Sequence, residues 1–307
     1  MANWTISDIP SLKGKLSVVT GGNSGIGWHT ALELARAGSE VVLTARSDVK
    51  GLDAVARIKR ELPEALIRYE LLDLASLPSV RTFASKVGNE PKIDLLINNA
   101  GVMAVPTRQV TGDGFELQLG TNFLGPFALT ALLLPALIRC GGPRVTTVSS
   151  GAANMGMKRI NFDDMNWEKS YHPWDAYCQS KLADLLFFAE LGRRYGDSAK
   201  LLSTSAHPGF ARTNLQTSGP SRQQSLIFRI FGLVASQDAA GGALATLRAA
   251  VEPGIAQASY FGPGGFFGLK GSPVAIPLPE PAQDKAAATK LWEVSERLTG
   301  ALWPDWE

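Results

Sequence analysis

The feature that most constrains this chain is an alternation, repeated along most of its length, between short apolar runs and longer segments with helical spacing. Runs of four to six apolar residues suit buried strands, whereas the longer segments have the length and periodicity of helices. Strands that alternate with helices predict crossover units, in which parallel strands lie side by side and helices cover both faces. We therefore expect an α/β fold with a doubly wound parallel sheet.

The predicted elements fill a single domain of 307 residues. The strands are expected at residues 15–20, 40–44, 66–71, 93–97, 145–148, 201–206 and 258–261, and the helices at 26–37, 52–62, 77–87, 115–138, 175–195, 237–251 and 283–298. Two long connections, 151–174 and 210–236, interrupt this order. Loops of that length inside a compact domain are usually functional, so both are predicted to contact the substrate. The apolar run at 226–234 is expected to be a lid over an apolar substrate, and a membrane-contacting patch is the alternative.

Composition excludes several classes of protein. The net charge of +2 gives no broad basic field for nucleic acid. Two cysteines, Cys140 and Cys178, cannot make a disulfide framework, which favours a reducing, cytoplasmic compartment. The N-terminus lacks the basic region and apolar run of a signal peptide, and the apolar run 127–138 is too short to span a bilayer. His29 and His172 have no metal-ligand spacing, so no metal site is expected.

A glycine-rich turn joins the first predicted strand to the first predicted helix. Its sequence is Thr20-Gly-Gly-Asn-Ser-Gly-Ile-Gly27. Gly21, Gly25 and Gly27 remove side chains where a backbone must approach a ligand, and the helix that follows directs its N–H groups and positive dipole end at an anion. This is the context of a dinucleotide fingerprint and hence of a Rossmann fold, although a purely structural turn is the alternative. No Lys-Ser/Thr pair follows, which argues against a P-loop nucleotidase.

Further motifs follow in order at the ends of later strands. They are Asn98-Asn-Ala-Gly101, Ser149-Ser150, Tyr177-Cys-Gln-Ser-Lys181, Pro208-Gly209 and Thr213. Together with the glycine turn they resemble the short-chain dehydrogenase/reductase family over roughly residues 15–215. The segment 161–167 and the sequence Tyr260-Phe-Gly-Pro resemble its retinol dehydrogenase and WW-domain oxidoreductase branch.

The resemblance implies a nicotinamide dinucleotide and a set of residues that bind it. That set is Gly21, Asn23, Ser24, Gly25, Ile26, Gly27, Arg46, Asp73, Leu74, Asn99, Ala100, Gly101, Tyr177, Lys181, Pro208, Gly209 and Thr213. Within it, the resemblance assigns Asp73 to the adenine and Lys181 to the nicotinamide ribose.

Tyr177 and Lys181 are predicted to be the centre of the catalytic group. They are four residues apart on a predicted helix and therefore share a face. A phenol has a pKa near 10, and a neighbouring ammonium lowers this pKa because it favours the phenolate. The pKa must fall by about 3 to come near neutral pH. Tyr177 would then donate a proton when a ketone is reduced and accept one when an alcohol is oxidised. A solvated pair on the helix surface is the alternative.

Ser150 is predicted to be the hydroxyl that orients the substrate oxygen. Side chains alternate along a strand, so only one of Ser149 and Ser150 can face the site. The family pattern matches Ser150, whose hydroxyl can stabilise charge that develops on the substrate oxygen. Ser149 is expected to make a strand-end hydrogen bond instead.

Asn122 completes the catalytic group. Pro126 lies four residues further along the predicted helix and has no N–H, so the carbonyl of Asn122 loses its helical donor and can accept a bond from a buried water. In the family the corresponding asparagine anchors a water that links the lysine to solvent. A locally bonded Asn122, in a helix that Pro126 merely kinks, is the alternative.

The end of the second predicted strand favours NADP(H) over NAD(H). An NAD-selective site places an acid about 20 residues beyond the glycines. Here the strand ends Thr44-Ala45-Arg46, and a guanidinium suits the 2′-phosphate of NADP. A surface arginine in a charged turn is the alternative.

The sequence therefore predicts an NADP(H)-dependent oxidoreductase that interconverts an alcohol and a ketone or aldehyde. Apolar residues in both long loops suggest a bulky, lipophilic carbonyl substrate. A sugar-nucleotide epimerase-like enzyme and a catalytically silent, nucleotide-sensing protein are the alternatives. The two long predicted helices, 115–138 and 175–195, carry surplus apolar surface, and relatives pair these helices across a two-fold axis, so we expect a homodimer.

Overall fold

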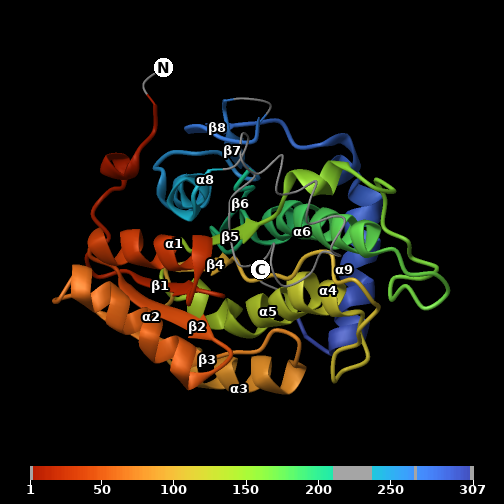
Figure 1. Ribbon diagram of the computed structural model, residues 1–307, viewed down its shortest axis with the longest axis horizontal. Coiled ribbons are helices and arrows are strands. Elements are labelled where there is room, and N and C mark those ends of the chain that lie inside the picture. Colours follow the sequence, from red (N-terminus) through yellow and green to blue (C-terminus); the bar gives the residue numbers. More distant parts are fainter. Residues whose placement is uncertain (1–2, 210–236, 266–267, 305–307) are drawn as a thin grey trace.

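Eight strands form one sheet in the computed structural model, in the order β3-β2-β1-β4-β5-β6-β7-β8 (Figure 1). The structure describes residues 3–209, 237–265 and 268–304. The strands are β1 Leu16–Val19, β2 Glu40–Ala45, β3 Ile67–Leu71, β4 Leu95–Asn98, β5 Arg144–Val148, β6 Leu202–Ala206, β7 Tyr260–Pro263 and β8 Pro273–Ala275. All seven predicted strands are present, and β1 to β7 pair in parallel. The doubly wound fold is confirmed.

The edge strand β8 is the one strand that the prediction of a parallel sheet misses. It pairs antiparallel with β7, with Val274 opposite Gly262. β8 has only three residues and begins with Pro273, so it contains no apolar run from which a strand could be predicted. Val274 and Ala275 are exposed. Proline is tolerated at a sheet edge because no neighbouring strand needs its missing N–H. Pairing with a strand already in place therefore decides this element.

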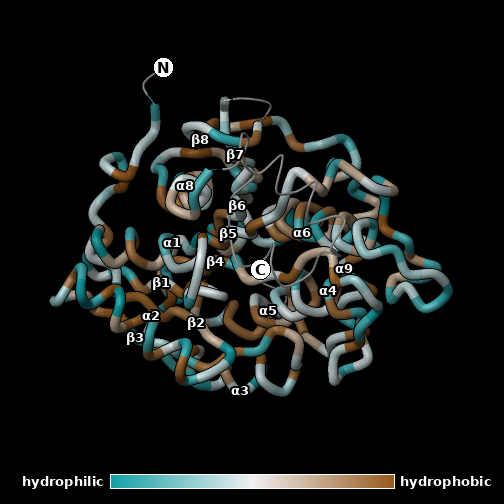
Figure 2. Tube along the Cα trace, viewed as in Figure 1, coloured by the Kyte–Doolittle hydropathy of each residue, from teal (hydrophilic) through white to brown (hydrophobic). Residues whose placement is uncertain are grey.

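Helices cover both faces of the sheet and enclose two apolar cores (Figure 1). One face carries α1 Gly25–Arg36, α2 Asp48–Glu61 and α8 Ala239–Val251, and the other carries α3 Leu77–Val87, α4 Leu117–Leu119, α5 Gly125–Ile138 and α6 Pro173–Tyr195. Neighbouring residues of one strand serve opposite cores, as Val18 and Val19 do. Figure 2 shows the apolar stretches gathered around the sheet and the polar stretches mostly in outer helices and loops.

The predicted helix 115–138 contains a change of helical type. It runs from Leu117 to Ile138, but Gly120–Leu124 forms a π-helical stretch, η2, in which the N–H of Gly125 bonds the carbonyl of Gly120. Pro126, which follows directly, has no N–H to continue the α-helical pattern. Wide turns of this kind are often found at functional sites. The prediction of a kink is thus replaced by a π turn that contains Asn122.

The C-terminal helix α9 Lys285–Thr299 covers α6 and part of α5. Trp292 is 2% exposed, and its ring centroid lies 5.1 Å from that of Phe127 and 4.3 Å from that of Trp303. Phe187 and Tyr195 of α6 also contact Trp292. The apolar surface that motivated the homodimer prediction is therefore covered, at least in part, from within the chain.

The continuous helical run from Leu117 to Ile138 also bears on whether the chain has a segment that could cross a membrane. It has 22 residues and is long and apolar enough to cross a bilayer, so the argument from a short apolar run does not hold. However, 83% of its most apolar window is buried inside the protein. That burial is typical of a core helix.

Candidate active site

The predicted site residues gather where the strand order reverses, between β1 and β4, at the carboxyl ends of the strands. In open α/β sheets this position forms the crevice in which ligands bind. The N-terminal part of α6 joins it, because the Nζ of Lys181 donates to the carbonyl of Val148 at the end of β5 (3.0 Å). Residues from strands, turns and helices far apart in sequence therefore share one region.

The glycine turn is held against the end of β4 by a set of short bonds. The hydroxyl of Thr20 accepts from the N–H groups of Asn99 (2.9 Å) and Ala100 (3.0 Å). Gly21 has φ +64, and a Cβ there would lie 3.0 Å from Ala100. A Cβ at Gly27 would lie 2.4 Å from the carbonyl oxygen of Gly21. Gly27 is thus required by packing within the turn itself, a reason that the sequence argument did not give.

The first N–H groups of α1 are not capped by a side chain. Ser24 is the N-cap residue, but its hydroxyl makes no capping bond. Orphan N–H groups at a helix N-terminus form a ready site for phosphate. This N-terminus fits the pyrophosphate of a dinucleotide, and Asn23, Gly25 and Ile26 lie in the same turn.

Arg57, on α2, supports this turn and was not predicted from the sequence. Its guanidinium donates to the carbonyl of Asn23 (2.8 Å) and lies 4.8 Å from the ring centroid of Trp28. The nitrogen Nε also forms an ion pair with Asp53. Arg57 lies 34 residues beyond Asn23, so no local spacing connects them.

At the end of β2, the side chains of Thr44 and Arg46 have different surroundings. The hydroxyl of Thr44 accepts from the N–H of Gly21 (3.1 Å), so this side chain supports the glycine turn. Arg46 is exposed, and within the described residues its guanidinium has neither a hydrogen bond nor an ion pair. A guanidinium without a partner beside the turn fits the additional phosphate of NADP.

Asp73 and Leu74, after β3, are placed differently from each other. The carboxylate of Asp73 accepts from the N–H of Ala75 (3.0 Å), and the residue is half-buried. Leu74 is 5% exposed and belongs to the core. Its carbonyl would lie 2.3 Å from a Cβ at Gly125. Only the backbone of Leu74 is therefore suited to contact a nucleotide.

Pro208 and Gly209 form a fixed turn after β6. Gly209 has φ +64, and a Cβ there would lie 2.3 Å from the carbonyl oxygen of Leu269. Gln237, which the sequence did not single out, donates to the carbonyl of Pro208 (2.7 Å). His207 accepts from the N–H of Gly209 (3.2 Å), and burial lowers the pKa of His207 to about 4. Thr213 and the run 226–234 lie outside the described residues.

The two serines at the end of β5 face different partners. Ser149 is buried, and its hydroxyl donates to the carbonyl of Lys181 (2.8 Å). Ser150 is half-buried and accepts from the N–H of Ala152 (3.2 Å), and its hydroxyl lowers the pKa of the Tyr177 phenol. Ser150, and not Ser149, is therefore the serine that acts on the tyrosine.

Lys181 is buried and makes two bonds to the protein through Nζ. One joins the carbonyl of Val148, and the other joins the carboxylate of Asp184 at 2.8 Å. Burial lowers the pKa of Lys181, but Asp184 and Tyr177 raise it by more, so it lies above its ordinary value. Asp184 was missed by the sequence reasoning, although it is an acid three residues beyond the predicted catalytic lysine.

The phenol of Tyr177 is more difficult to ionise than predicted. Burial raises its pKa, while the ammonium of Lys181 and the bond with Ser150 lower it without outweighing burial. Asp184 raises it further. The expectation that Lys181 brings this pKa toward neutrality is therefore not met by the protein alone. The reasons are burial and the carboxylate that accompanies the lysine.

The side chain of Asn122 ties the catalytic region to the segment after β4. Its Oδ1 accepts from the N–H of Val102 (2.7 Å), and its Nδ2 donates to the carbonyl of Val102 and to the hydroxyl of Ser180, each at 2.9 Å. A Cβ at Gly101 would lie 3.2 Å from Oδ1 of Asn122 and 3.8 Å from Nζ of Lys181. The side-chain amide of Asn122 is thus fully hydrogen-bonded to the protein. Any proton relay through Asn122 would therefore use its backbone carbonyl.

An apolar wall flanks the phenol of Tyr177. Ala152, Cys178, Met103 and Trp174 pack around it, and the ring centroid of Trp174 lies 5.6 Å away. Burial raises the pKa of the Cys178 thiol to about 12, so it stays neutral. This wall suits an apolar substrate beside a single reactive hydroxyl.

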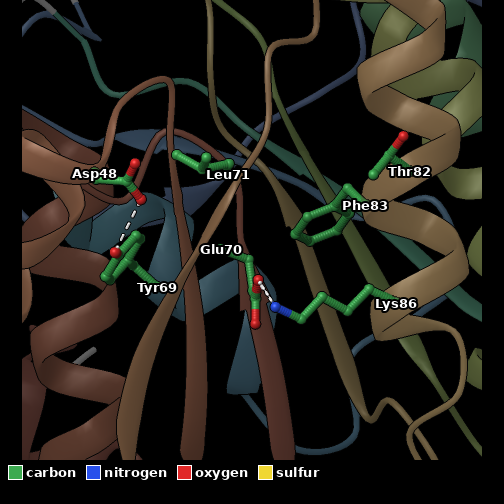
Figure 3. A pocket seen from close by; sticks show the side chains of 7 residues that line it. All are labelled: Asp48, Tyr69, Glu70, Leu71, Thr82, Phe83 and Lys86. Atoms are coloured by element: carbon green, nitrogen blue, oxygen red, sulfur yellow. Dashed lines mark hydrogen bonds and ion pairs between the residues drawn. The ribbon is translucent and has the colours of Figure 1, made fainter.

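Two surface hollows lie away from these residues. One, of about 390 Å³, lies at the edge strand β3 and is lined by Asp48, Tyr69, Glu70, Leu71, Thr82, Phe83 and Lys86 (Figure 3). Its polar groups pair with one another, Tyr69 with Asp48 and Lys86 with Glu70. The other, of about 610 Å³, lies between α6 and the segment before α9. Neither contains a predicted site residue.

Metal-binding chemistry has no support within the described part of the chain. That part holds no group of three or more His, Cys, Asp or Glu side chains placed to bind a metal ion. His207 is neutral and bonded to Gly209, as a structural histidine would be.

Comparison with known proteins gives consistent relatives. The model of the short chain dehydrogenase family matches residues 15–224. Human (Homo sapiens) retinol dehydrogenase 13 is 42% identical over 298 residues, which cover 94% of this chain and 86% of that protein.

Solved structures with the same fold include close and distant examples. The crystal structure of an uncharacterized protein from Mycobacterium Paratuberculosis has a TM-score of 0.81 at 42% identity and covers 99% of this chain and 100% of that one. A Pseudomonas aeruginosa RhlG/NADP active-site complex has a TM-score of 0.55 at 26% identity, covering 67% of this chain and 77% of that one.

Proposed function

The chain belongs to the short chain dehydrogenase family and is an oxidoreductase, and from that premise we propose that it interconverts an alcohol and a ketone or aldehyde with NADP(H), using Tyr177 as general acid and base. The observation that carries this proposal is the group of Ser150, Tyr177 and Lys181. Tyr177 and Lys181 are buried, and Ser150 is half-buried. They lie at the same edge of the sheet as the uncapped N-terminus of α1, where the strand order reverses.

The proposed mechanism assigns one task to each side chain. Ser150 donates a hydrogen bond to the substrate oxygen and holds it near Tyr177. In reduction, Tyr177 gives its proton to that oxygen, and in oxidation the phenolate takes the proton back. Because the pKa of Tyr177 is raised, the resting phenol suits reduction at neutral pH. Asn122 would connect Lys181 to solvent through a water on its backbone carbonyl.

The proposed cofactor site fits the chain at three places. The first N–H groups of α1 fit the pyrophosphate, and the guanidinium of Arg46, which has no partner among the described residues, fits the 2′-phosphate. Lys181 would hold the nicotinamide ribose. When bound, the nicotinamide would supply or accept the hydride at the substrate carbon. The likeness to a complex that contains NADP supports the proposal, but that ligand belongs to the other protein.

The proposed substrate is a bulky, lipophilic carbonyl compound. The apolar wall of Met103, Ala152 and Trp174 beside Tyr177 supports this, as does the similarity to a protein named retinol dehydrogenase 13. Retinal is therefore one member of the panel that tests the proposal. Ketones and aldehydes of increasing size would be assayed with NADPH and NADH, with each alcohol assayed in the reverse direction.

The same panel separates the alternatives. Turnover of NADPH with larger apolar carbonyl compounds is the expected result. Interconversion of sugar nucleotides without net consumption of NADPH would instead indicate an epimerase-like enzyme. Cofactor binding without turnover of any member would favour the nucleotide-sensing alternative and contradict the proposed function.

The homodimer and the cytoplasmic location remain proposals. Since α9 covers much of α5 and α6, the proposed dimer would use apolar residues that remain exposed near these helices, such as Leu132 and Leu298. A single species of 32.8 kDa in light scattering at micromolar concentration would contradict the dimer. We also propose that Leu117 to Ile138 is a core helix rather than a membrane span.

A further inference from the structure

A buried carboxylate contacts the lysine of the proposed catalytic group. Asp184 lies three residues after Lys181 on α6, and its Oδ2 is 2.8 Å from Nζ of Lys181. The two side chains are 2% and 7% exposed. Neither the resemblance to the family nor the proposed mechanism assigns a task to this acid.

The two bonds of Lys181 define where its ammonium can be. An ammonium has three donors, and two of them are taken, by the carbonyl of Val148 and by the carboxylate of Asp184. The remaining donor is left for a ligand or for Tyr177. The carboxylate of Asp184 is the one charged group among these two acceptors, and with Val148 it holds the ammonium in place.

Asp184 also decides how much charge the phenol experiences. An isolated ammonium in a buried site would favour ionisation of a nearby phenol. A carboxylate in contact with that ammonium offsets part of its field. Burial is the main reason that the pKa of Tyr177 is raised, and Asp184 adds to this rise, against the lowering by Lys181.

The charged and titratable groups around this site are few. Tyr177 experiences Lys181, Asp184 and the thiol of Cys178, all from α6, together with the hydroxyl of Ser150 from the end of β5. Lys181 experiences Asp184 and Tyr177. Burial raises the pKa of Asp184 to about 6, and Lys181 opposes this shift, so Asp184 is ionised at neutral pH. The largest electrostatic contributions to these three groups thus come from within the site itself.

We propose that Asp184 is a positioning residue, which fixes the ammonium of Lys181 and offsets its charge so that Tyr177 rests as a neutral phenol able to donate a proton. This inference rests on the proposed function, since it assigns the phenol to proton transfer. It predicts that the pH at which each direction gains or loses activity is set in part by a residue that touches neither substrate nor cofactor.

The first test needs no turnover. The ionisation of Tyr177 in the cofactor-free protein would be followed by ultraviolet difference spectroscopy against the Tyr177→Phe protein. In Asp184→Asn, which keeps the shape of the side chain and removes its charge, we expect a lower pKa for Tyr177 than in the wild type. Should that variant not fold, Asp184→Ala carries the same expectation.

The matched control is Glu190→Gln. Glu190 is also a buried acid on α6, with a side chain 1% exposed and ion pairs to Arg193 and Arg194. Its replacement removes a buried carboxylate from the same helix without touching Lys181. We expect it to affect stability and to leave the pKa of Tyr177 unchanged.

The second test uses pH profiles of kcat/KM in both directions. Oxidation needs the phenolate and rises with pH, whereas reduction needs the phenol and falls with pH. A lower pKa in Asp184→Asn therefore moves both limbs toward acid pH. A Tyr177 pKa and profiles that match those of the wild type and of Glu190→Gln would overturn the inference.

The outcomes for the two proposals are distinguishable. If no substrate of the panel turns over, the proposed function fails, but the titration of Tyr177 still tests Asp184. If wild-type turnover is normal and Asp184→Asn loses activity equally at every pH with no shift of the phenol, Asp184 is only structural, and the proposed function stands.

Discussion

At the catalytic end of the site the side chains are buried and bonded, whereas at the end of β2 the key side chain is exposed and has no bonded partner in the described structure. Lys181 makes two bonds and Asn122 makes three, all to groups of the protein. Arg46 makes none within the described residues. The residues proposed to be catalytic are thus held by the protein itself, whereas the proposed partner of Arg46 is the 2′-phosphate of the cofactor.

This difference has energetic consequences. Groups held in place act in a low-dielectric site, where a proton donor or an oriented hydroxyl has a large effect on rate. A solvated arginine changes only the binding of a ligand that carries the matching charge. Substitutions at the two ends should therefore differ in both size and kind.

The largest effect is expected for Tyr177→Phe, which keeps the ring and removes the transferable proton. Turnover should fall by ~100-fold or more, the scale of general acid-base catalysis, while NADPH binding persists. Tyr171→Phe is the control, because its phenol is hydrogen-bonded to the carbonyl of Val105 instead of to Ser150. Steady-state rates and a fluorescence titration of the cofactor provide the two measurements. Near-normal turnover in folded Tyr177→Phe would contradict the proton transfer assigned to Tyr177.

The next effect separates the two serines. Ser150→Ala should lower kcat by roughly 100-fold or more, as the loss of a donor to a developing oxyanion does. Ser149→Ala removes one buried bond to the carbonyl of Lys181, which should cost about 1 kcal/mol of stability and little activity. Rates and denaturant unfolding measure the pair. An exchange of the two results would show that the structure assigns the orienting hydroxyl to the wrong serine.

At the other end, Arg46→Ala should affect one cofactor only. A charge-assisted bond to phosphate contributes about 1.5–3 kcal/mol, so NADPH should bind roughly 10- to 150-fold more weakly and NADH nearly as before. Lys50→Ala, a change of another exposed cation in the same region, is the control. Equal weakening of both cofactors, or a wild type that prefers NADH, would contradict the selectivity assigned to Arg46.

The smallest effect sharpens the boundary between the two ends. Arg57→Met removes one bond to the carbonyl of Asn23 while keeping an apolar stem against Trp28. A bond of about 0.5–1.5 kcal/mol corresponds to roughly 2- to 10-fold weaker binding, and it should affect NADPH and NADH equally. Calorimetric titration with both cofactors measures this. A loss confined to NADPH would place Arg57 with Arg46 at the 2′-phosphate.

Local patterns predict most of the fold and the residues of the proposed catalytic group. The predicted helix 77–87 has the bounds that α3 has, because helical spacing is a property of one short segment. The spacing of four between Tyr177 and Lys181 predicts one shared helix face for the same reason. Alternation along a strand allows only one of Ser149 and Ser150 to face the site, and the resemblance to the family selects Ser150.

Other features depend on contacts that no local pattern contains. β8 exists because β7 offers an edge, and the bond of Arg57 to Asn23 joins α2 to a turn 34 residues earlier. Likewise, α9 covers α5 and α6 although its start lies 90 residues beyond the end of α6 in sequence. Thr213 and the apolar run 226–234 stay predictions, since both lie outside the described residues.

The sequence by itself determined the succession of strands and helices along the chain, the glycine turn and the residue types of the proposed catalytic group. Each of these depends only on the spacing of residues that are close in sequence. Only the tertiary structure decided the protonation state of the phenol. The reason is that the pKa of Tyr177 sums its burial with the fields of Lys181 and Asp184, and burial depends on how distant segments pack. Spacing can place an ammonium beside a phenol, but it cannot state how much water the packed protein removes from both.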